Sequence, residues 1–288
     1  MTISPILALL RPHQWVKNVF IFPPLFFTPQ RVSLESVIAV SLGFACFCAI
    51  SSAVYIINDF ADRASDRQHP EKCMRPLAAG TVSVRTALTL ALVLGAAAMV
   101  GAYAIAPGFL VVVVTYLLLN LAYTFAIKHV SILDVFVIAL SFILRLKGGA
   151  IIVDVQPSVW IIVCTGLLAM FLAIGKRRDD LVRILDQGHR GSLAGYNIRY
   201  LDTASGIVLG ALFVAYTIYT TDTAVMHNLG TDQLYLTVPF VLAGILRYLQ
   251  IMVVEEKSGA PTKVVLHDTF LKVTILGWIA TFGLLIYR

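Results

Sequence analysis

The chain contains 288 residues, of which 59% are hydrophobic and only 13% are charged, and its formal net charge is +6. About a quarter of the residues of a typical soluble domain are charged, so this composition excludes an ordinary soluble protein. In a membrane protein a small excess of Lys and Arg follows from topology. We therefore expect a lipid bilayer, and no nucleic acid, as the partner of this surface.

Apolar stretches recur along the whole chain and predict one all-α integral membrane domain over residues 1–288. A membrane-spanning helix needs about 20 mostly apolar residues. Nine segments meet or approach this length: 16–29, 34–57, 84–105, 108–127, 132–153, 157–175, 203–221, 233–252 and 269–287. Pro23-Pro24 interrupts the first of them, and Pro107-Gly108 divides an uncharged stretch that is too long for one span.

Lys and Arg are distributed unevenly among the loops that connect these segments. The loops at 58–85 and 176–202 are basic, with one lysine and several arginines each. The alternate loops, which contain neither, lie near Pro107, at 154–157 and at 222–232. Because positively charged loops face the cytoplasm, we expect a multi-pass protein of the plasma membrane with its N-terminus and both basic loops in the cytoplasm.

The most polar segment, residues 58–80, reads NDFADRASDRQHPEKCMRPLAAG. If the preceding helix continues into it, four side chains fall within an arc of about 100°: Asn58, Asp59, Asp62 and Asp66. Carboxylates crowded on one face repel one another unless a cation lies among them, and a set of oxygen ligands favours Mg²⁺. The alternative is a solvated loop in which these carboxylates pair with Arg63 and Arg67.

The pattern NDxxDxxxD at 58–66, followed by RPLAAG at 75–80, resembles the first signature of the UbiA superfamily of intramembrane transferases. The resemblance implies a fold of nine helices around a central cavity. It also implies that Asn58, Asp59, Asp62 and Asp66 hold Mg²⁺ against the pyrophosphate of a donor. Arg75 would add a fixed positive charge, so that Asp59, Asp62 and Arg75 form the catalytic set.

Four further segments resemble one branch of this superfamily, the decaprenyl-phosphate phosphoribosyltransferases. These segments are RPHQWVKNVFIF at 11–22, IKHVSILD at 127–134, SFILRLKGGA at 141–150 and GKRRDDL at 175–181. The branch implies phosphoribosyl pyrophosphate as the donor and a polyprenyl phosphate lipid as the acceptor. Most other members transfer a prenyl group and carry a second Asp-rich DxxxD cluster, whereas here three cations precede the acidic residues.

The donor of this branch carries a pyrophosphate and a 5-phosphate, and the acceptor carries another phosphate; these anionic groups require several cations. The residues expected to contact the substrates are Lys17, Asn18, Tyr123, Lys128, Asp134, Arg145, Lys176, Arg177, Arg178 and Tyr196. The run 176–178 either binds an anionic group of a substrate, or Lys176 forms a salt-bridge ladder with Asp180 and Arg183 along its own helix. Tyr123 and Tyr196 either line the cavity or belong to an interfacial aromatic belt.

Two cations, Arg145 and Lys147, lie well inside the predicted span 132–153. An unpaired cation at this depth costs about 3 kcal/mol or more. We expect them either to pair with Asp134 or Asp154, or to contact the phosphate of the lipid.

The resemblance implies a reaction without a general base, because the acceptor phosphate is already ionised. An alternative is a prenyltransferase of the same fold that moves a prenyl group from a prenyl diphosphate to an aromatic or similar acceptor. A membrane protein without enzymatic activity, such as a transporter, is disfavoured, because transporters place their polar groups at broken helices near the midplane. A homo-oligomer is compatible with the sequence, which does not determine the oligomeric state.

Overall fold

The computed structural model describes residues 4–186, 195–256, 264–265 and 267–287, and all regular structure in these residues is helical. The all-α prediction is therefore confirmed. The chain divides into two compact units. Unit 1 comprises residues 1–130 and 144–156, and unit 2 comprises residues 131–143 and 157–288. Each unit is described by itself.

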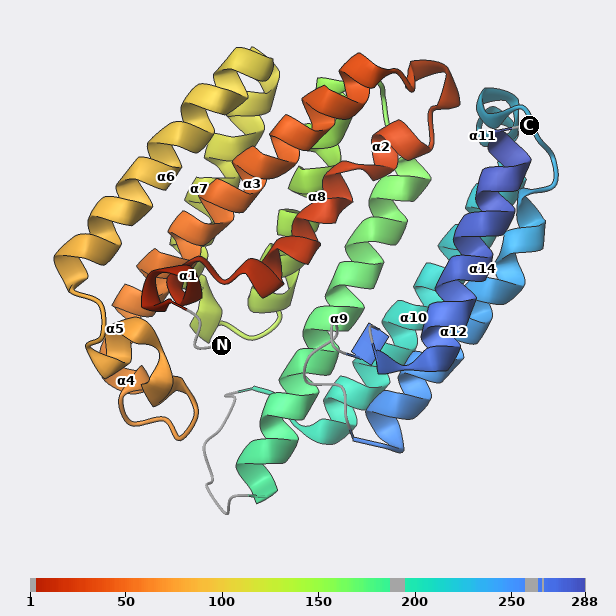
Figure 1. Cartoon of the computed structure of the whole chain (residues 1–288). Coiled ribbons are helices and arrows are strands. Elements are labelled where there is room, and N and C mark those ends of the chain that lie inside the picture. The colour runs from red at the N-terminus through yellow and green to blue at the C-terminus, as the bar shows by residue number, and fades with distance from the viewer. Residues whose placement is uncertain (1–3, 187–194, 257–263, 266, 288) are drawn as a thin grey trace. The chain divides into compact units, whose positions relative to one another are not determined.

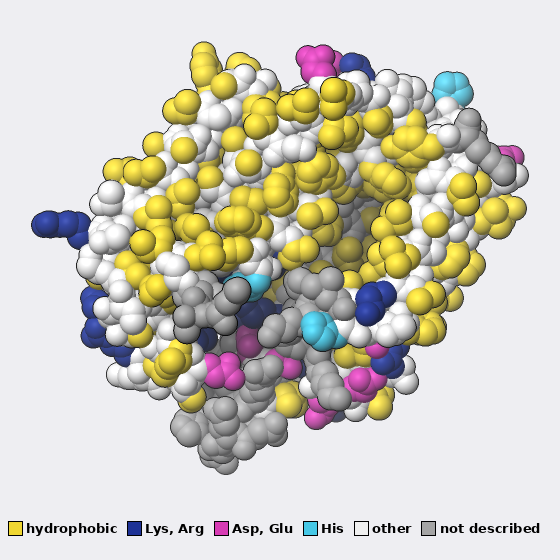
Figure 2. Space-filling model, in the orientation of Figure 1, with side chains coloured by type: hydrophobic (Ala, Val, Ile, Leu, Met, Phe, Trp, Pro, Cys, Tyr) yellow, Lys and Arg dark blue, Asp and Glu magenta, His cyan; other side chains and the backbone are white. Residues whose placement is uncertain are grey.

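Within the described residues, eight helical segments are long and apolar enough to cross a membrane. They are α3 (Leu34–Ala61), α6 (Val84–Ile105), α7 (Pro107–Phe125), α8 (Leu133–Ile152), α9 (Val159–Asp186), α10 (Ile198–Thr221), α12 (Val238–Val253, preceded by the 3₁₀ turn η5, Leu234–Thr237) and α14 (Thr269–Ile286) (Figure 1). All eight overlap predicted spans, although α9 continues beyond its predicted end at 175 and α10 begins before its predicted start at 203. Figure 2 shows hydrophobic side chains over most of the visible face, with Lys, Arg, Asp and Glu at its edges and in its lower part, as expected of a surface that faces lipid.

Short helices connect or flank these segments. They are α1 (Pro5–Leu10), η1 (Pro12–Ile21), α2 (Pro23–Phe26), η2 (Pro29–Arg31), α4 (Arg63–Asp66), η3 (Lys72–Met74), α5 (Pro76–Ala79), η4 (Ile127–His129) and α11 (Thr223–Leu229). The predicted first span, 16–29, is not a continuous α-helix but falls within η1, α2 and η2. Pro12, Pro23 and Pro29 each begin a new helical piece, because proline lacks the backbone donor that would continue the preceding one. The predicted count of nine spanning helices is thus not confirmed by the described residues.

The N-terminal segment nevertheless runs antiparallel to α3 over much of its length (Figure 1). The carbonyl oxygen of Leu10 accepts a hydrogen bond from Ser52 Oγ at 2.9 Å, while Ile21 and Leu25 join the cluster of buried side chains that contains Val40. A ten-residue 3₁₀ helix such as η1 rises about 20 Å. The segment therefore extends along α3 without forming a spanning α-helix.

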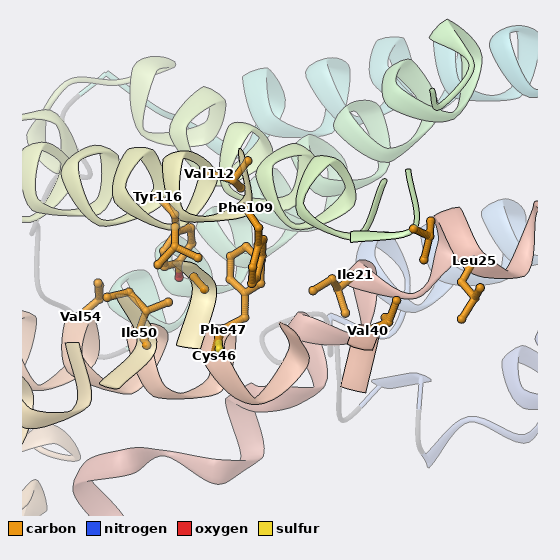
Figure 3. Close-up of a cluster of buried hydrophobic side chains, with 14 residues drawn as sticks. Ile21, Leu25, Val40, Cys46, Phe47, Ile50, Val54, Phe109, Val112 and Tyr116 are labelled. Atoms are coloured by element: carbon orange, nitrogen blue, oxygen red, sulfur yellow. The ribbon is translucent and has the colours of Figure 1, made fainter. Parts of the chain in front are cut away.

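The core of unit 1 is aromatic, with Phe47, Phe109 and Tyr116 packed edge to face (Figure 3). A polar network lies beside it. Arg145 Nε donates to Asn18 Oδ1 at 2.7 Å, and Arg145 Nη2 donates to the Tyr116 hydroxyl at 3.0 Å. The guanidinium also lies over the rings of Tyr116 and Phe47.

These contacts bury Asn18 and Arg145 completely or nearly so. Asn18 also donates to Ser51 Oγ at 3.3 Å, so the network joins η1, α3 and α8. The expected pairing of Arg145 with Asp134 or Asp154 is wrong, since Asp134 pairs with Arg177 and Asp154 with Arg31. Lys147 is exposed.

Gly149 permits the closest approach between η1 and α8. A Cβ atom built on Gly149 would lie 1.9 Å from the backbone oxygen of Ile21. We expect Gly149→Ala to lower the stability of the protein by about 1–3 kcal/mol, the usual cost of overpacking, measured by thermal unfolding in detergent. Gly210→Ala is the matched control, because a Cβ there meets nothing within 4 Å. Equal unfolding temperatures for the two variants would contradict the close approach.

A buried tyrosine in unit 2 gives a second stability prediction. Tyr248 packs against Phe171, and among the described residues its hydroxyl oxygen has no hydrogen-bond partner. An unsatisfied buried hydroxyl is destabilising, so we expect Tyr248→Phe to raise stability by about 1 kcal/mol. Tyr216→Phe should do the opposite, because the Tyr216 hydroxyl bonds to Thr237 and to Trp278 at 2.6 Å each. Destabilisation by Tyr248→Phe would show that this hydroxyl has a partner.

Candidate functional site

The acidic segment begins where α3 ends. The helix is interrupted at Asp62 and resumes as α4. The Asp62 amide still donates to the Asn58 carbonyl at 2.9 Å, and the Asp66 amide donates to the Asp62 carbonyl at 2.8 Å. Because the helical path is almost preserved across this break, Asp59 and Asp66 project toward the same side, as their spacing predicts.

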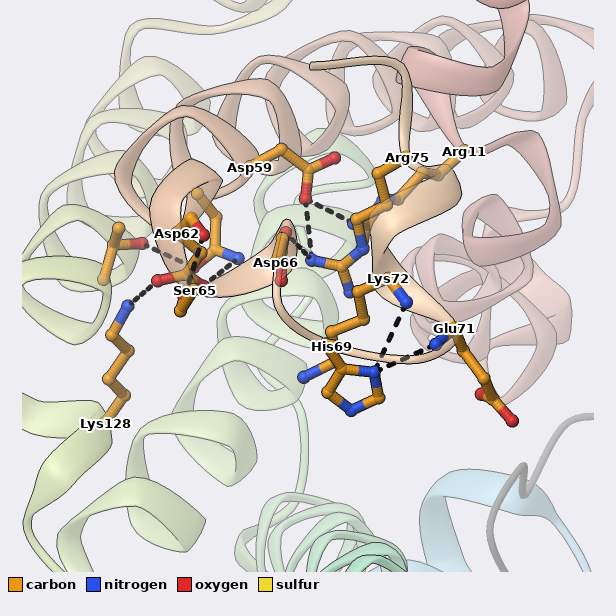
Figure 4. A network of polar contacts seen from close by, with 12 residues as sticks. Arg11, Asp59, Asp62, Ser65, Asp66, His69, Glu71, Lys72, Arg75 and Lys128 are labelled. Atoms are coloured by element: carbon orange, nitrogen blue, oxygen red, sulfur yellow. Dashed lines mark hydrogen bonds and ion pairs between the residues drawn. The ribbon is translucent and has the colours of Figure 1, made fainter. Parts of the chain in front are cut away.

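Asp59 and Asp66 converge on one guanidinium group (Figure 4). Arg75 Nη1 lies 3.1 Å from Asp59 Oδ1 and 2.7 Å from Asp66 Oδ2. Both aspartates are buried, with 2% and 3% of their surface exposed. Arg75 has an extended backbone immediately before Pro76, which begins α5. The Arg-Pro step therefore places this cation between the two carboxylates.

A second arginine, Arg11, reaches the same carboxylate and was not identified in the sequence analysis. Its Nη2 atom lies 2.5 Å from Asp59 Oδ1, and its guanidinium lies over the ring of Tyr55. Arg11 precedes Pro12 just as Arg75 precedes Pro76. This repeated Arg-Pro pair is the sequence signal that would have drawn attention to it.

Asp62 faces a different cation. It forms an ion pair with Lys128 of η4, and its second oxygen accepts a hydrogen bond from Asn58 Nδ2 at 3.2 Å. Asn58 Oδ1 in turn accepts a hydrogen bond from Thr124 at the end of α7. The predicted residues Asn58, Asp62 and Lys128 are thus brought together, as one branch of a cluster whose other branch is Asp59 with Asp66.

The alternative in which the aspartates pair with Arg63 and Arg67 is wrong. Arg63 Nε donates to the Leu77 carbonyl and Arg67 Nε to the Ala78 carbonyl, each at 3.1 Å. These two arginines hold α4 against α5. The carboxylates instead receive their positive charge from Arg11, Arg75 and Lys128, which come from outside α3 and α4.

The donor chemistry of this cluster fits a divalent metal ion in part. Asp59 and Asp66 direct oxygens at one nitrogen atom, Arg75 Nη1, and hard carboxylate oxygens are the ligands that Mg²⁺ prefers. Among the residues that the structure describes, no three His, Cys, Asp or Glu side chains are arranged to hold a metal as they lie, since Asp62 turns toward Lys128. Asp59 and Asp66 would form the metal-binding pair once Arg75 moves aside.

In unit 2 the predicted residues Asp134, Arg177 and Tyr196 meet at the start of α8. Asp134 is 3% exposed; its two oxygens lie 2.7 Å from Arg177 Nε and 2.7 Å from the Tyr196 hydroxyl, which donates. The backbone amide of Ile132 donates to the same hydroxyl at 2.6 Å. Ile132 has a φ of 73°. A left-handed β-branched residue is rare, so this turn is held in place by the network around it.

The three cations at 176–178 have separate environments. Lys176 is exposed, whereas Arg177 also lies 3.7 Å from Asp180. Arg178 is buried and pairs with Asp202 of α10 at 2.6 Å, a partner not predicted from sequence. Arg177 and Asp180 are a pair that the expected ladder of Lys176, Asp180 and Arg183 did not include. The side chain of Arg183 lies outside the part of the chain that the structure describes. Lys17 in η1 and Tyr123 in α7 are partly exposed.

Long apolar helices and a charged cluster at the end of α3 define a multi-pass integral membrane protein. The model of the UbiA prenyltransferase family matches residues 20–283, and the chain belongs to this family. The decaprenyl-phosphate phosphoribosyltransferase of Mycobacterium tuberculosis is 32% identical over 287 residues, which cover 98% of this chain and 94% of the relative. The enzyme of the same name from Corynebacterium glutamicum is 32% identical, with 96% and 85% covered.

Solved structures agree on the fold. A UbiA homologue from Archaeoglobus fulgidus, solved bound to DMAPP and Mg²⁺, superimposes with a TM-score of 0.73 and 20% identity over 99% of both chains. The same homologue bound to GPP and Mg²⁺ gives a TM-score of 0.72. The resemblance inferred from the acidic segment is thereby confirmed at the level of family and fold.

The pKa of Tyr196 is raised from 10.0 to about 12, first by burial and then by its hydrogen bond to Asp134. A raised pKa contributes stability that is complete below the unfolded-state value and is lost as the pH rises through the folded-state value. We expect Tyr196→Phe to lower stability at neutral pH by about 1 kcal/mol. Between pH 10 and about 12, the variant should lose less stability than the wild type in denaturant titrations. If the stability of the variant and of the wild type fell equally over this pH range, the raised pKa of Tyr196 would be contradicted.

Proposed function

We propose that the protein transfers 5-phosphoribose from phosphoribosyl pyrophosphate to a polyprenyl phosphate of the decaprenyl type, releasing pyrophosphate in a Mg²⁺-dependent reaction. The observation that carries this proposal is the full-length similarity to relatives that bear the name decaprenyl-phosphate phosphoribosyltransferase. The charged cluster of unit 1 supports it with groups suited to a diphosphate. The proposed location is the plasma membrane, with this cluster on the cytoplasmic side.

Within unit 1 we assign Asp59 and Asp66 to the metal and place Asp62 beside them, where Asn58 orients its carboxylate. Bound Mg²⁺ would neutralise the negative charge that develops on the leaving pyrophosphate. Arg75, released from the two carboxylates, donates to phosphate oxygens in a planar fork that suits them. Lys128 supplies a further charge at the Asp62 side. Both cations place positive charge where negative charge develops on the pyrophosphate.

The chemical step needs little else from the protein. An oxygen of the acceptor phosphate forms the new bond to C1 of the ribose, while the bond from C1 to the pyrophosphate oxygen breaks and the pyrophosphate leaves with the electron pair. The acceptor oxygen is already ionised at neutral pH, so no proton has to be removed. The absence of a catalytic histidine from the proposed set follows from this chemistry.

In unit 2 the exposed Lys176 is the member of the basic run that we assign to an anionic group of a substrate. Arg177 pairs with Asp134, and Arg178 pairs with Asp202. Their proposed role is to hold the C-terminal part of α9 in position. Tyr196 has the same proposed role, because its hydroxyl bonds to Asp134. For Asn18 and Arg145, which are buried against each other, we propose a positioning role in place of direct substrate contact.

The decisive test is a transfer assay. Purified protein in detergent is incubated with Mg²⁺, radiolabelled phosphoribosyl pyrophosphate and a polyprenyl monophosphate, and label is counted in the organic phase. Metal-dependent label in the lipid supports the proposal. Turnover of a prenyl diphosphate with an aromatic acceptor, without labelled lipid, would instead identify a prenyltransferase of the same fold.

Asp62→Asn tests the metal-site assignment. We expect it to lower the transfer rate by about a hundredfold or more, because the carboxylate beside the metal-binding pair helps to attract the cation that neutralises the leaving pyrophosphate, while the unfolding temperature stays near that of the wild type. Asp154→Asn is the matched control, since the Asp154 side chain is 94% exposed and lies beside Arg31. A folded Asp62→Asn variant with near-normal activity would contradict the assignment.

A further inference from the structure

The carboxylate of Asp59 pairs with two arginines in unit 1. Its Oδ1 atom alone receives Arg11 Nη2 at 2.5 Å and Arg75 Nη1 at 3.1 Å, and the residue is 2% exposed. A buried carboxylate without a counter-charge is strongly unfavourable. The two guanidinium groups therefore supply the positive charge that this oxygen requires when no metal ion is bound.

The two arginines are attached to the fold in different ways. Arg75 bridges Asp59 and Asp66 and has an extended backbone before α5. Arg11 contacts Asp59 alone among these carboxylates, and it links α1 to η1 with φ 50° and ψ 59°.

The backbone of Arg11 is disfavoured twice. Residues other than glycine rarely adopt the left-handed region, and a residue that precedes proline, as Arg11 precedes Pro12, is driven toward extended conformations. Such conformations persist where the surrounding structure imposes them. Here Leu9 is fully buried against α3, and the Leu10 carbonyl accepts a hydrogen bond from Ser52. The ion pair with Asp59 is the third contact that holds the backbone of Arg11 in this conformation.

We propose that Arg11 is a displaceable counter-ion of Asp59, which holds the carboxylate oxygen in the metal-free protein and leaves it when a divalent cation binds. The proposal rests on the assignment of Asp59 to the metal made above. Loss of the ion pair removes one of the constraints on the left-handed backbone, so departure of the side chain also loosens the junction between α1 and η1. Arg11 is therefore a positioning residue that competes with the metal.

The first test is metal affinity without substrate. Mn²⁺ alone, as a probe for the divalent site, is titrated calorimetrically into wild type, Arg11→Gln and Arg85→Gln. Removing a competing charge-assisted hydrogen bond should tighten binding to Arg11→Gln about tenfold. Arg85→Gln, which removes the same charge from an exposed position at the start of α6, should bind like the wild type. Unchanged or weaker binding to Arg11→Gln would overturn the proposal.

A second test needs no variant and covers the case in which Arg11→Gln fails to fold. Hydrogen exchange of residues 5–15 is measured in the wild type with and without Mg²⁺. The proposal expects faster exchange with metal, opposite to the protection that ligand binding normally gives. Slower or unchanged exchange would overturn it, and so would the absence of any metal binding. Neither readout involves labelled lipid, so the transfer assay judges the proposed function separately.

Discussion

The negative charge on Asp59 is the constraint on which the arrangement of unit 1 depends. It lies at the last turn of a membrane-length helix, almost out of contact with solvent, where leaving it without a counter-charge would cost on the order of 3–5 kcal/mol. Its partners come from opposite sides in sequence, Arg11 before α3 and Arg75 after it. Ion pairs with this one carboxylate thereby connect the N-terminal segment and the α4–α5 loop to the end of α3.

The same demand for satisfied polar groups explains why the N-terminal segment can be irregular. Backbone groups that face lipid must be bonded within the protein, and a 3₁₀ helix interrupted by prolines leaves several of them exposed. Here the Ser52 hydroxyl of α3 donates to the Leu10 carbonyl and accepts from Trp15 Nε1, while the Asn18 side chain bonds to Ser51 of α3 and Arg145 of α8. These contacts hold the irregular segment against α3 and α8.

Much of this fold follows from sequence because apolar length is a local property. Residues 84–105 were predicted as a span and form α6 with the same bounds. The segment 16–29 was predicted less well, since its apolar character is compatible with several conformations and its prolines decide among them. In the candidate site, the common direction of Asp59 and Asp66 follows from helical spacing and was predictable.

The partners of the charged residues were harder to predict. Local spacing suggested Arg63 and Arg67 for the aspartates, but both bond to backbone carbonyls. Arg11 and Lys128 lie 48 and 66 residues from their carboxylates, and Arg178 pairs with Asp202 of a neighbouring helix. Such pairs depend on how helices pack, which periodicity and composition do not describe. The repeated Arg-Pro step was the only local hint.

The contact between η1 and α8 also has a consequence for the order of synthesis. Asn18 bonds to Arg145, 127 residues further along the chain, and Ile21 rests on Gly149. At about 5–20 residues per second, a ribosome needs about 6–25 seconds to reach Arg145 after Asn18 has been made. The η1 segment must therefore wait, without its final partners on α8, until most of unit 1 has been translated. In unit 1 the placement of η1 is thus completed only after α8 has been made.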